Sequence, residues 1–291
     1  MFQKVHDVLN LKFIQHQELL ESFYPGINPK ILIREFLTFN AGNKNENFLV
    51  DSFTENKINA FMALCLKGIP LEYITGIGHF YGRDFIVAKG VLIPRQETEI
   101  IIEEVNKIKN DLPEKITVLD LCAGSGCIGI SLACELSTKV KKLILSDVSD
   151  DALNFIKINK QKFEYQYSQS TEIEIVKSDL FQNIHSMFDL IVTNPPYIKR
   201  HEQFSLVHEQ VIKNEPHLAL FIEDSEYDKF FDGLMSSARK SLKTKGYFFM
   251  EGHELELEKI LQKWKINFSN DDVSIIQDLS GRDRFLKVRK E

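Results

Sequence analysis

The sequence has no apolar run that approaches the roughly 18 residues of a membrane-spanning helix. Its N-terminus, MFQKVHDVLN, contains no apolar core of the kind that a secretion signal requires. Cysteine is scarce: there are four, they form no CxxC pair, and Cys122, Cys127 and Cys134 crowd around one Gly-rich turn and the helix expected after it. We therefore expect reduced thiols in a soluble, cytoplasmic protein that has no membrane partner.

The chain also lacks the basic excess that a broad nucleic-acid footprint requires, because its 291 residues carry a net charge of −6. Direct binding of nucleic acid is therefore not expected. The pairs His201-Glu202 and His208-Glu209 do not fit the H-E-x-x-H motif, so we expect no metal site. A hydrophobic content of 43% is ordinary for a globular protein, and the length favours two domains.

Residues 1–70 have the pattern of a helical domain. Asn28-Pro29 is a favourable helix start, because an N-cap residue precedes a proline at the first helical position. This helix is expected to stop near Ala41-Gly42. A second helix is expected from about Thr54, because apolar residues follow at helical spacing: Ile58, Phe61, Met62 and Cys65.

Residues 71–94 change character, since pairs such as Tyr73-Ile74 and Phe80-Tyr81 alternate with glycines, which predicts a β-hairpin linker. Strands and helices then alternate over residues 95–291. Strands are expected at 117–121, 143–145, 173–176, 188–193, 246–250, 272–277 and 284–288, with helices between most of them. This alternation predicts a doubly wound, mainly parallel α/β sheet to which a closing hairpin adds one antiparallel strand.

A glycine-bearing turn follows the strand expected at 117–121. Gly124 and Gly126 allow close approach of the backbone to a ligand and a positive φ. Asp147 ends the next expected strand, where an acid can accept hydrogen bonds from both hydroxyls of a ribose. The pattern therefore predicts a nucleoside site at the carboxyl edge of the sheet.

The charges around this turn distinguish between possible ligands. NAD-binding folds share this glycine pattern, but Asp120 would repel a pyrophosphate while suiting an ammonium group. S-adenosylmethionine carries no phosphate and two cationic groups, so we expect it to be the cofactor. Asp120 and Asp147 could instead cap helices, and Asp179 could be an ordinary turn residue. The expected cofactor-binding residues are Asp120, Cys122, Ala123, Gly124, Ser125, Gly126, Asp147, Asp179, Leu180 and Asn194.

The segment Asn194-Pro195-Pro196-Tyr197 follows the apolar strand expected at 188–193. Its prolines fix two φ angles and lack N–H donors, so the loop cannot curl into a helix. The side-chain oxygen of Asn194 and the carbonyl of Pro195 suit a planar –NH2 group, which has two donors to satisfy. Tyr197 adds an aromatic face, although it could also be a core aromatic. We expect methyl transfer to a conjugated nitrogen, with Asn194, Pro195 and Tyr197 catalytic and Pro196 also contacting the substrate.

Four segments resemble the peptide chain release factor glutamine methyltransferases: Val118–Gly129, Ile93–Glu99, Phe188–Ile198 and Glu215–Leu220. The resemblance covers nearly the whole chain. It implies a seven-stranded, class I S-adenosylmethionine-dependent methyltransferase domain at 95–291, behind a helical substrate-recognition domain at 1–70 and a hairpin linker at 71–94. It also implies methylation of N5 of the glutamine in the Gly-Gly-Gln loop of class 1 release factors, which modulates translation termination. We expect the enzyme to be a monomer.

Two departures from the family pattern stand out. Cys122 occupies the place of the first glycine of the family's glycine motif. A cysteine fits there only if the turn does not need a positive φ at this position. Met250–Glu256 matches the usual Glu-Ile-Gly-x-x-Gln only loosely.

Two other functions compete with this interpretation. An adenine-N6 or cytosine-N4 DNA methyltransferase would also bind a planar amino group, but it would need a basic target-recognition domain. A non-catalytic S-adenosylmethionine-binding module would have no use for the Asn-Pro-Pro-Tyr segment.

Overall fold

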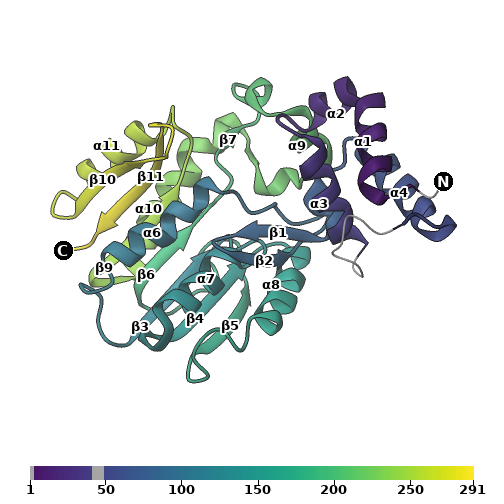
Figure 1. Ribbon diagram of the computed structural model, residues 1–291. Coiled ribbons are helices and arrows are strands. Elements are labelled where there is room, and N and C mark those ends of the chain that lie inside the picture. Colours follow the sequence, from purple (N-terminus) through teal and green to yellow (C-terminus); the bar gives the residue numbers. More distant parts are fainter. Residues whose placement is uncertain (1–2, 41–48) are drawn as a thin grey trace. The chain divides into compact units, whose positions relative to one another are not determined.

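The computed structural model describes residues 3–40 and 49–291 (Figure 1). The helix end expected at Ala41-Gly42 lies outside the described residues. The chain divides into two compact units. The first holds Met1–Ile77, Val87–Lys89 and Val207–Glu215, and the second holds Gly78–Ile86, Gly90–Leu206 and Pro216–Glu291. The domain boundaries at 70 and 94 stay predictions, because each unit takes short segments from beyond them.

The first unit is helical, as expected. Asn28 caps its third helix by accepting a hydrogen bond from the Ile31 N–H at 3.1 Å, with Pro29 in the first turn, which confirms the predicted helix start. Phe36 and Phe61 are fully buried between the helices, with ring centroids 5.6 Å apart. The helices are α1 (Val5–Gln15), α2 (Gln17–Phe23), α3 (Pro29–Phe39), α4 (Ser52–Cys65), α5 (Leu71–Thr75) and α9 (Glu209–Asn214).

The short helix α5 corrects the sequence analysis, which included Tyr73-Ile74 in a hairpin. Pro70 immediately precedes this helix, and its carbonyl accepts hydrogen bonds from the Tyr73 and Ile74 N–H groups. Gly76 ends the helix in the left-handed conformation, with φ of 75°. The hairpin is therefore confined to β1 (Ile77–Phe80) and β2 (Arg83–Ile86).

The second unit is built on a seven-stranded sheet, whose strand order is β10-β11-β9-β6-β3-β4-β5. All neighbours run parallel except β11, which is antiparallel to both β9 and β10. The expected doubly wound fold with one antiparallel strand is thus confirmed. The strands are β3 (Ile116–Leu121), β4 (Val140–Asp147), β5 (Glu172–Lys177), β6 (Phe188–Thr193), β9 (Leu242–Glu251), β10 (Asp272–Gln277) and β11 (Asp283–Arg289).

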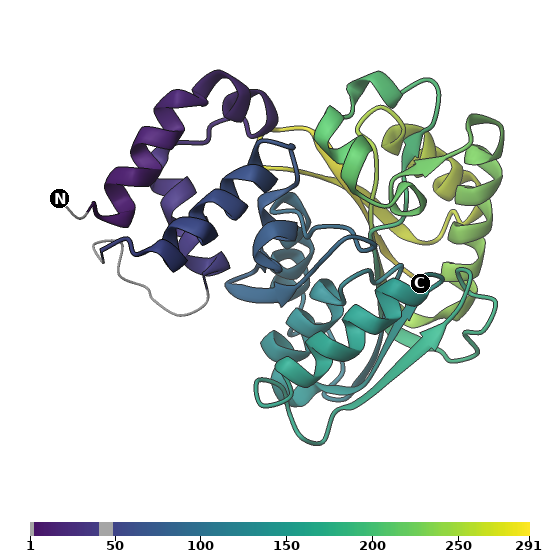
Figure 2. The same ribbon diagram turned by 90° about the vertical axis from the view of Figure 1, so that its right-hand side faces the viewer.

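Helices cover both faces of this sheet (Figures 1 and 2). Successive residues of a strand point to opposite faces, so Val118 and Leu119 belong to different cores. One core includes α6 (Ile100–Lys107), α7 (Cys127–Leu136) and α8 (Asp150–Lys162), and the other includes α10 (Tyr227–Ser241) and α11 (Leu257–Asn267). Both faces of the sheet are covered by helices, and every residue of β6 is buried, including the polar Asp189 and Thr193. None of the helices in the described ranges combines the length and apolarity that a bilayer span requires.

The carboxyl ends of three adjacent strands meet at one edge of the sheet. Leu121 of β3 is paired with Ser146 of β4 on one side and with Thr193 of β6 on the other. The Thr193 hydroxyl also donates to the Leu121 carbonyl at 2.7 Å. The turn after β3, Asp147 and Asn194 are consequently neighbours, although they lie far apart in the sequence.

The sequence analysis missed a small parallel pair beyond this edge, β7 (Ile198–Lys199) with β8 (Phe221–Ile222). Two residues per strand leave no periodic pattern to detect. This pair fixes the chain directly after Asn194-Pro195-Pro196-Tyr197.

Gly129 brings α7 close to the sheet. Its N–H donates to the Asp120 carboxylate at 2.7 Å, and a Cβ at this position would lie 2.5 Å from Leu145 Cδ2 and 2.9 Å from Asp120 Cβ. A side chain here would push the helix away from β3 and from the turn that begins it.

We expect Gly129→Ala to lower the free energy of unfolding by about 1–3 kcal/mol, because the added methyl group overpacks the core. Gly233→Ala is the matched control: Gly233 lies in α10 with open space around it, so alanine should stabilise by about 0.5–1 kcal/mol. Urea unfolding of both variants provides the measurement. Equal stability of the two variants would show that α7 has room to move.

Candidate active site

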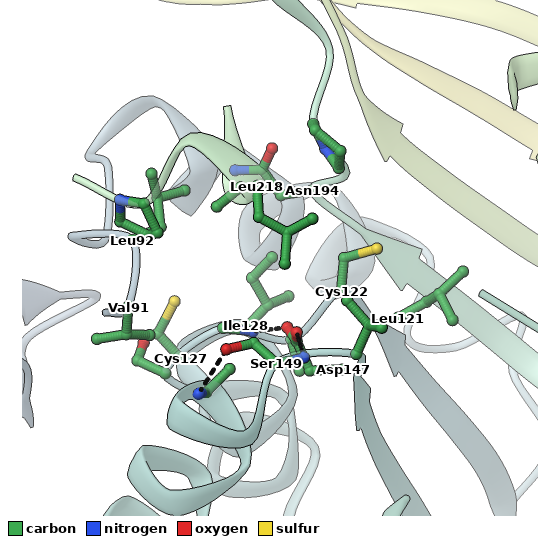
Figure 3. A pocket seen from close by; sticks show the side chains of 18 of the residues that line it. Val91, Leu92, Leu121, Cys122, Cys127, Ile128, Asp147, Ser149, Asn194 and Leu218 are labelled. Atoms are coloured by element: carbon green, nitrogen blue, oxygen red, sulfur yellow. Dashed lines mark hydrogen bonds between the residues drawn. The ribbon is translucent and has the colours of Figure 1, made fainter. Parts of the chain in front are cut away.

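A pocket opens at the carboxyl edge of β3, β4 and β6 (Figure 3). Nine of the residues predicted from the sequence line it: Cys122, Ala123, Gly124, Ser125, Asp147, Asp179, Leu180, Asn194 and Pro196. Asp120, Gly126, Pro195 and Tyr197 are not among the lining residues. The structure therefore brings most of the residues predicted to bind the methyl donor, and part of those predicted to bind the methyl acceptor, to one cavity.

Two segments that carry the family resemblance, but in which no site residue was predicted, also line the pocket. Ile93–Glu99 supplies Pro94, Arg95 and Thr98, and Glu215–Leu220 supplies Pro216, Leu218 and Ala219. The other unpredicted lining residues come from the segment before α6, from the ends of β3, β4 and β5 and the residues just after them, and from the starts of α7, α8 and α10: Gly90, Val91, Leu92, Leu121, Cys127, Ile128, Val148, Ser149, Ala152, Ser178 and Phe230. Most of these residues have apolar side chains.

Asp147 connects the segments on one side of the pocket, the turn after β3 and the start of α8, where the methyl donor is expected; we call this the donor side. One carboxylate oxygen accepts a hydrogen bond from the Gly124 N–H at 2.9 Å, and the other accepts from the Ser149 N–H at 2.9 Å. Burial raises the pKa of this carboxyl group. The turn after β3 and the start of α8 are thereby tied to the end of β4, and each oxygen retains a lone pair for a ligand.

The turn after β3 has left-handed backbone at three positions. Gly124 (φ 56°) and Gly126 (φ 79°) confirm the positive φ expected of them. Cys122, with φ of 58°, shows that the expectation of a negative φ there was wrong. The Ala123 N–H donates to the Ser146 carbonyl of β4, so the hydrogen bonding between β3 and β4 continues past Cys122. A non-glycine residue in this conformation costs of order 1–3 kcal/mol.

Asp120 lies beneath the pocket, and its side chain is fully buried. Its Oδ2 caps α7 through the Gly129 N–H, the structural alternative that the sequence left open, while Oδ1 is buried without a hydrogen-bond partner among the described residues. Burial raises the pKa of this group to about 7. Direct contact between Asp120 and a ligand stays a prediction.

The charged residues of the pocket wall are Arg95, Asp147 and Asp179, and Asp120 lies behind the wall. This acidic balance suits a ligand that has a cationic group and no phosphate. Among the described residues, no group of three or more His, Cys, Asp or Glu side chains is placed to hold a metal ion.

Asn194 lies across the pocket from Asp147 and Ser149 in Figure 3. Its Nδ2 donates to the Thr98 hydroxyl at 3.3 Å, and that hydroxyl donates to Oε2 of Glu251 at 2.5 Å. The Tyr197 hydroxyl donates to the other oxygen of Glu251 at 3.0 Å. Burial raises the pKa of Glu251, which is 1% exposed. One carboxylate thus joins the segments that carry Thr98 and Tyr197.

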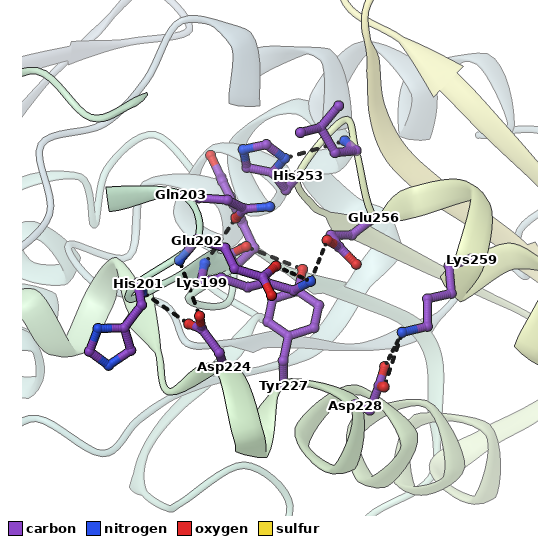
Figure 4. A network of polar contacts seen from close by, with 12 residues as sticks. Lys199, His201, Glu202, Gln203, Asp224, Tyr227, Asp228, His253, Glu256 and Lys259 are labelled. Atoms are coloured by element: carbon purple, nitrogen blue, oxygen red, sulfur yellow. Dashed lines mark hydrogen bonds and ion pairs between the residues drawn. The ribbon is translucent and has the colours of Figure 1, made fainter. Parts of the chain in front are cut away.

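A second polar network supports the chain after Asn194 (Figure 4). The Tyr227 hydroxyl donates to the Tyr197 carbonyl at 3.2 Å, and Lys199 Nζ lies 5.2 Å from the Tyr227 ring centroid. Lys199 also forms ion pairs with Glu202 at 2.9 Å and Glu256 at 2.8 Å, and these hydrogen bonds raise its pKa. The acceptor side of the pocket is therefore anchored to α10 and to the start of α11.

Comparison with known proteins identifies the family. Residues 96–220 match the family model described as "Methyltransferase small domain". A release factor glutamine methyltransferase of Leptospira interrogans is 35% identical over 271 residues, which cover 89% of each chain. The chain belongs to the release factor glutamine methyltransferase family.

Other similar proteins differ in length or have lower sequence identity. A "Bifunctional methyltransferase" of Rickettsia typhi is 34% identical over 288 residues, or 90% of this chain and 54% of that protein. The chain thus spans about half the length of such relatives. A solved structure of a ribosomal protein L11 methylase from Lactobacillus delbrueckii has a TM-score of 0.48 at 19% identity, covering 73% of this chain and 90% of that one.

Proposed function

We propose that this chain transfers a methyl group from S-adenosylmethionine to the side-chain amide N5 of the glutamine in the Gly-Gly-Gln loop of class 1 release factors, and so modulates translation termination. The relatives named as release factor glutamine methyltransferases support the proposal. The observation that carries it is the position of Asn194, a fixed amide at the wall of an acidic, largely apolar pocket.

The donor side fits S-adenosylmethionine. Asp147 would accept from the ribose hydroxyls, and Asp179 would accept from the adenine amino group beside the apolar wall formed by Leu180. Burial raises the pKa of Asp120 to about 7, and a nearby ammonium group would favour its ionised form and be attracted to it. The cofactor supplies a methyl group made electrophilic by the sulfonium to which it is bonded.

The acceptor side addresses a chemical difficulty, because a carboxamide nitrogen is a poor nucleophile whose lone pair is delocalised into its carbonyl. Asn194 Oδ1 and the Pro195 carbonyl would accept its two N–H groups and aim the lone pair toward the methyl group. They would also stabilise the positive charge that grows on the nitrogen. Such positioning can supply roughly 7–11 kcal/mol of a barrier. The nitrogen becomes acidic as it is methylated, and its proton can then leave to water.

The same arrangement could hold the amino group of a nucleobase, so the test must include DNA. The net charge of −6 favours a protein acceptor. We also propose that the enzyme is a cytoplasmic monomer without a direct nucleic-acid partner, and that residues 1–70 recognise the release factor.

We expect Asp147→Ala to weaken binding of S-adenosylmethionine roughly 10- to 100-fold, the usual effect of losing hydrogen bonds to a charged group. Asp150→Ala is the matched control, because Asp150 is an exposed acid that pairs with Lys177 and does not line the pocket. Isothermal calorimetry measures both affinities. Wild-type affinity in Asp147→Ala would remove this carboxylate from the donor site.

The acceptor is tested with radiolabelled S-adenosylmethionine and three substrates: a class 1 release factor, the same protein with its loop glutamine changed to alanine, and duplex DNA. We expect label on the first alone. Asn194→Ala should reduce the single-turnover rate roughly 100- to 1,000-fold while donor binding persists. Equal label on the alanine variant, or label mainly on DNA, would contradict the glutamine assignment.

A further inference from the structure

Thr98 connects Asn194 to a buried carboxylate. It lies in a single 3-10 turn, Glu97–Glu99, directly before α6, and it is 2% exposed. Its hydroxyl contacts Asn194 Nδ2 at 3.3 Å and Glu251 Oε2 at 2.5 Å. The three side chains come from the segment before α6, the end of β6 and the end of β9, so only the folded sheet brings them together.

The number of hydrogens determines the direction of each bond in this chain. A threonine hydroxyl has one hydrogen to donate, and an ionised carboxylate has none. Glu251 accepts from the Tyr197 hydroxyl at 3.0 Å and from the Thr98 hydroxyl at 2.5 Å. Burial raises the pKa of Glu251, and these two hydrogen bonds oppose that shift. The Thr98 hydrogen therefore goes to Glu251, and the Thr98 oxygen can only accept from Asn194.

This direction decides which end of the Asn194 amide faces Thr98. The two ends of a primary amide have nearly the same shape, so packing alone distinguishes them poorly. An oxygen facing the Thr98 oxygen would place two acceptors together without a hydrogen, whereas the NH2 group donates to it. The Oδ1 end is consequently the end turned away from Thr98.

We propose that Thr98 and Glu251 are positioning residues that fix the polarity of the Asn194 amide, so that its oxygen, and not its NH2 group, is presented to the acceptor nitrogen. The inference rests on the proposed function, in which the acceptor carries an –NH2 group. A reversed Asn194 would place NH2 against NH2, which forms no hydrogen bond and repels the charge that grows on the nitrogen. Glu251 thus acts on the reaction without touching either substrate.

Tyr197 has a defined part in this arrangement. Its hydroxyl donates a hydrogen bond to Glu251, and its backbone carbonyl accepts one from the Tyr227 hydroxyl at 3.2 Å. Tyr197 therefore holds the Glu251 oxygen that Thr98 does not contact.

Two conservative variants test the proposal. Thr98→Val removes the hydroxyl and keeps the shape, and Thr98→Ser keeps the hydroxyl. With a release factor as acceptor, we expect Thr98→Val to lose roughly 10- to 100-fold in single-turnover rate, part of the effect of losing a preorganised group. The donor Kd and the acceptor KM should stay within about threefold of wild type, because the bound molecules keep their other contacts. Thr98→Ser should recover most of the rate.

A wild-type rate in Thr98→Val, or an equal loss in Thr98→Ser, would overturn the inference. A wild-type enzyme that does not label the release factor would instead overturn the proposed function, so the two failures are distinguishable. Unfolding midpoints are recorded for each variant.

A second substitution, at Glu251, distinguishes control of the Asn194 amide orientation from simple packing. It also tests the proposal if Thr98→Val does not fold. Glu251→Gln keeps the size of the side chain but removes the charge that directs the Thr98 hydrogen. We expect a similar loss of rate with donor Kd retained, and a double variant with Thr98→Val that is no slower than the slower single variant, because both act through Asn194. Additive losses, or a wild-type rate in Glu251→Gln, would show that the two residues only pack.

Discussion

The acceptor side of the site depends on one buried carboxylate, that of Glu251 at the end of β9. It accepts hydroxyl hydrogens from Thr98 and Tyr197, which lie on segments far apart in the sequence. The donor side depends in the same way on Asp147, which accepts N–H groups from the turn after β3 and from the start of α8. At an edge where strands end and the backbone becomes irregular, Asp147 accepts backbone N–H groups, whereas Glu251 accepts side-chain hydroxyls.

The pocket also concentrates conformational strain. Cys122 and Leu180 both line it with left-handed backbone, φ of 58° and 47°, and such positions cost of order 1–3 kcal/mol each. Local hydrogen bonds hold them: the Ser178 hydroxyl donates to the Leu180 carbonyl at 2.7 Å, and the Ala123 N–H donates to β4. The two apolar cores of the sheet supply the stability that this strain requires. Rigid, strained backbone at the pocket is consistent with a site that must position its ligands closely.

The sequence predicted the sheet well because buried parallel strands are continuous apolar runs and their helices have clear periodicity. The pocket residues Gly124, Asp147 and Asn194 were predicted because each belongs to a short motif that follows or ends a strand. Helix α5 was missed because five residues between Pro70 and Gly76 are too few for a helical period. The positive φ of Cys122 depends on how β3 pairs with β4, which a turn motif alone does not determine.

Glu251 could not be predicted as part of the site. Its bond to Thr98 spans 153 residues, and neither residue stands out until the sheet order places β9 beside β6. The most direct measurement is neutron diffraction from crystals exchanged into heavy water, which locates the deuterium atoms between Asn194, Thr98 and Glu251. We expect the two deuterium atoms of the Asn194 amide to lie on its nitrogen, with one of them directed at the Thr98 oxygen. The deuterium of the Thr98 hydroxyl should be directed at Glu251. A deuterium on Glu251 directed at Thr98, with the Asn194 oxygen facing Thr98, would contradict it.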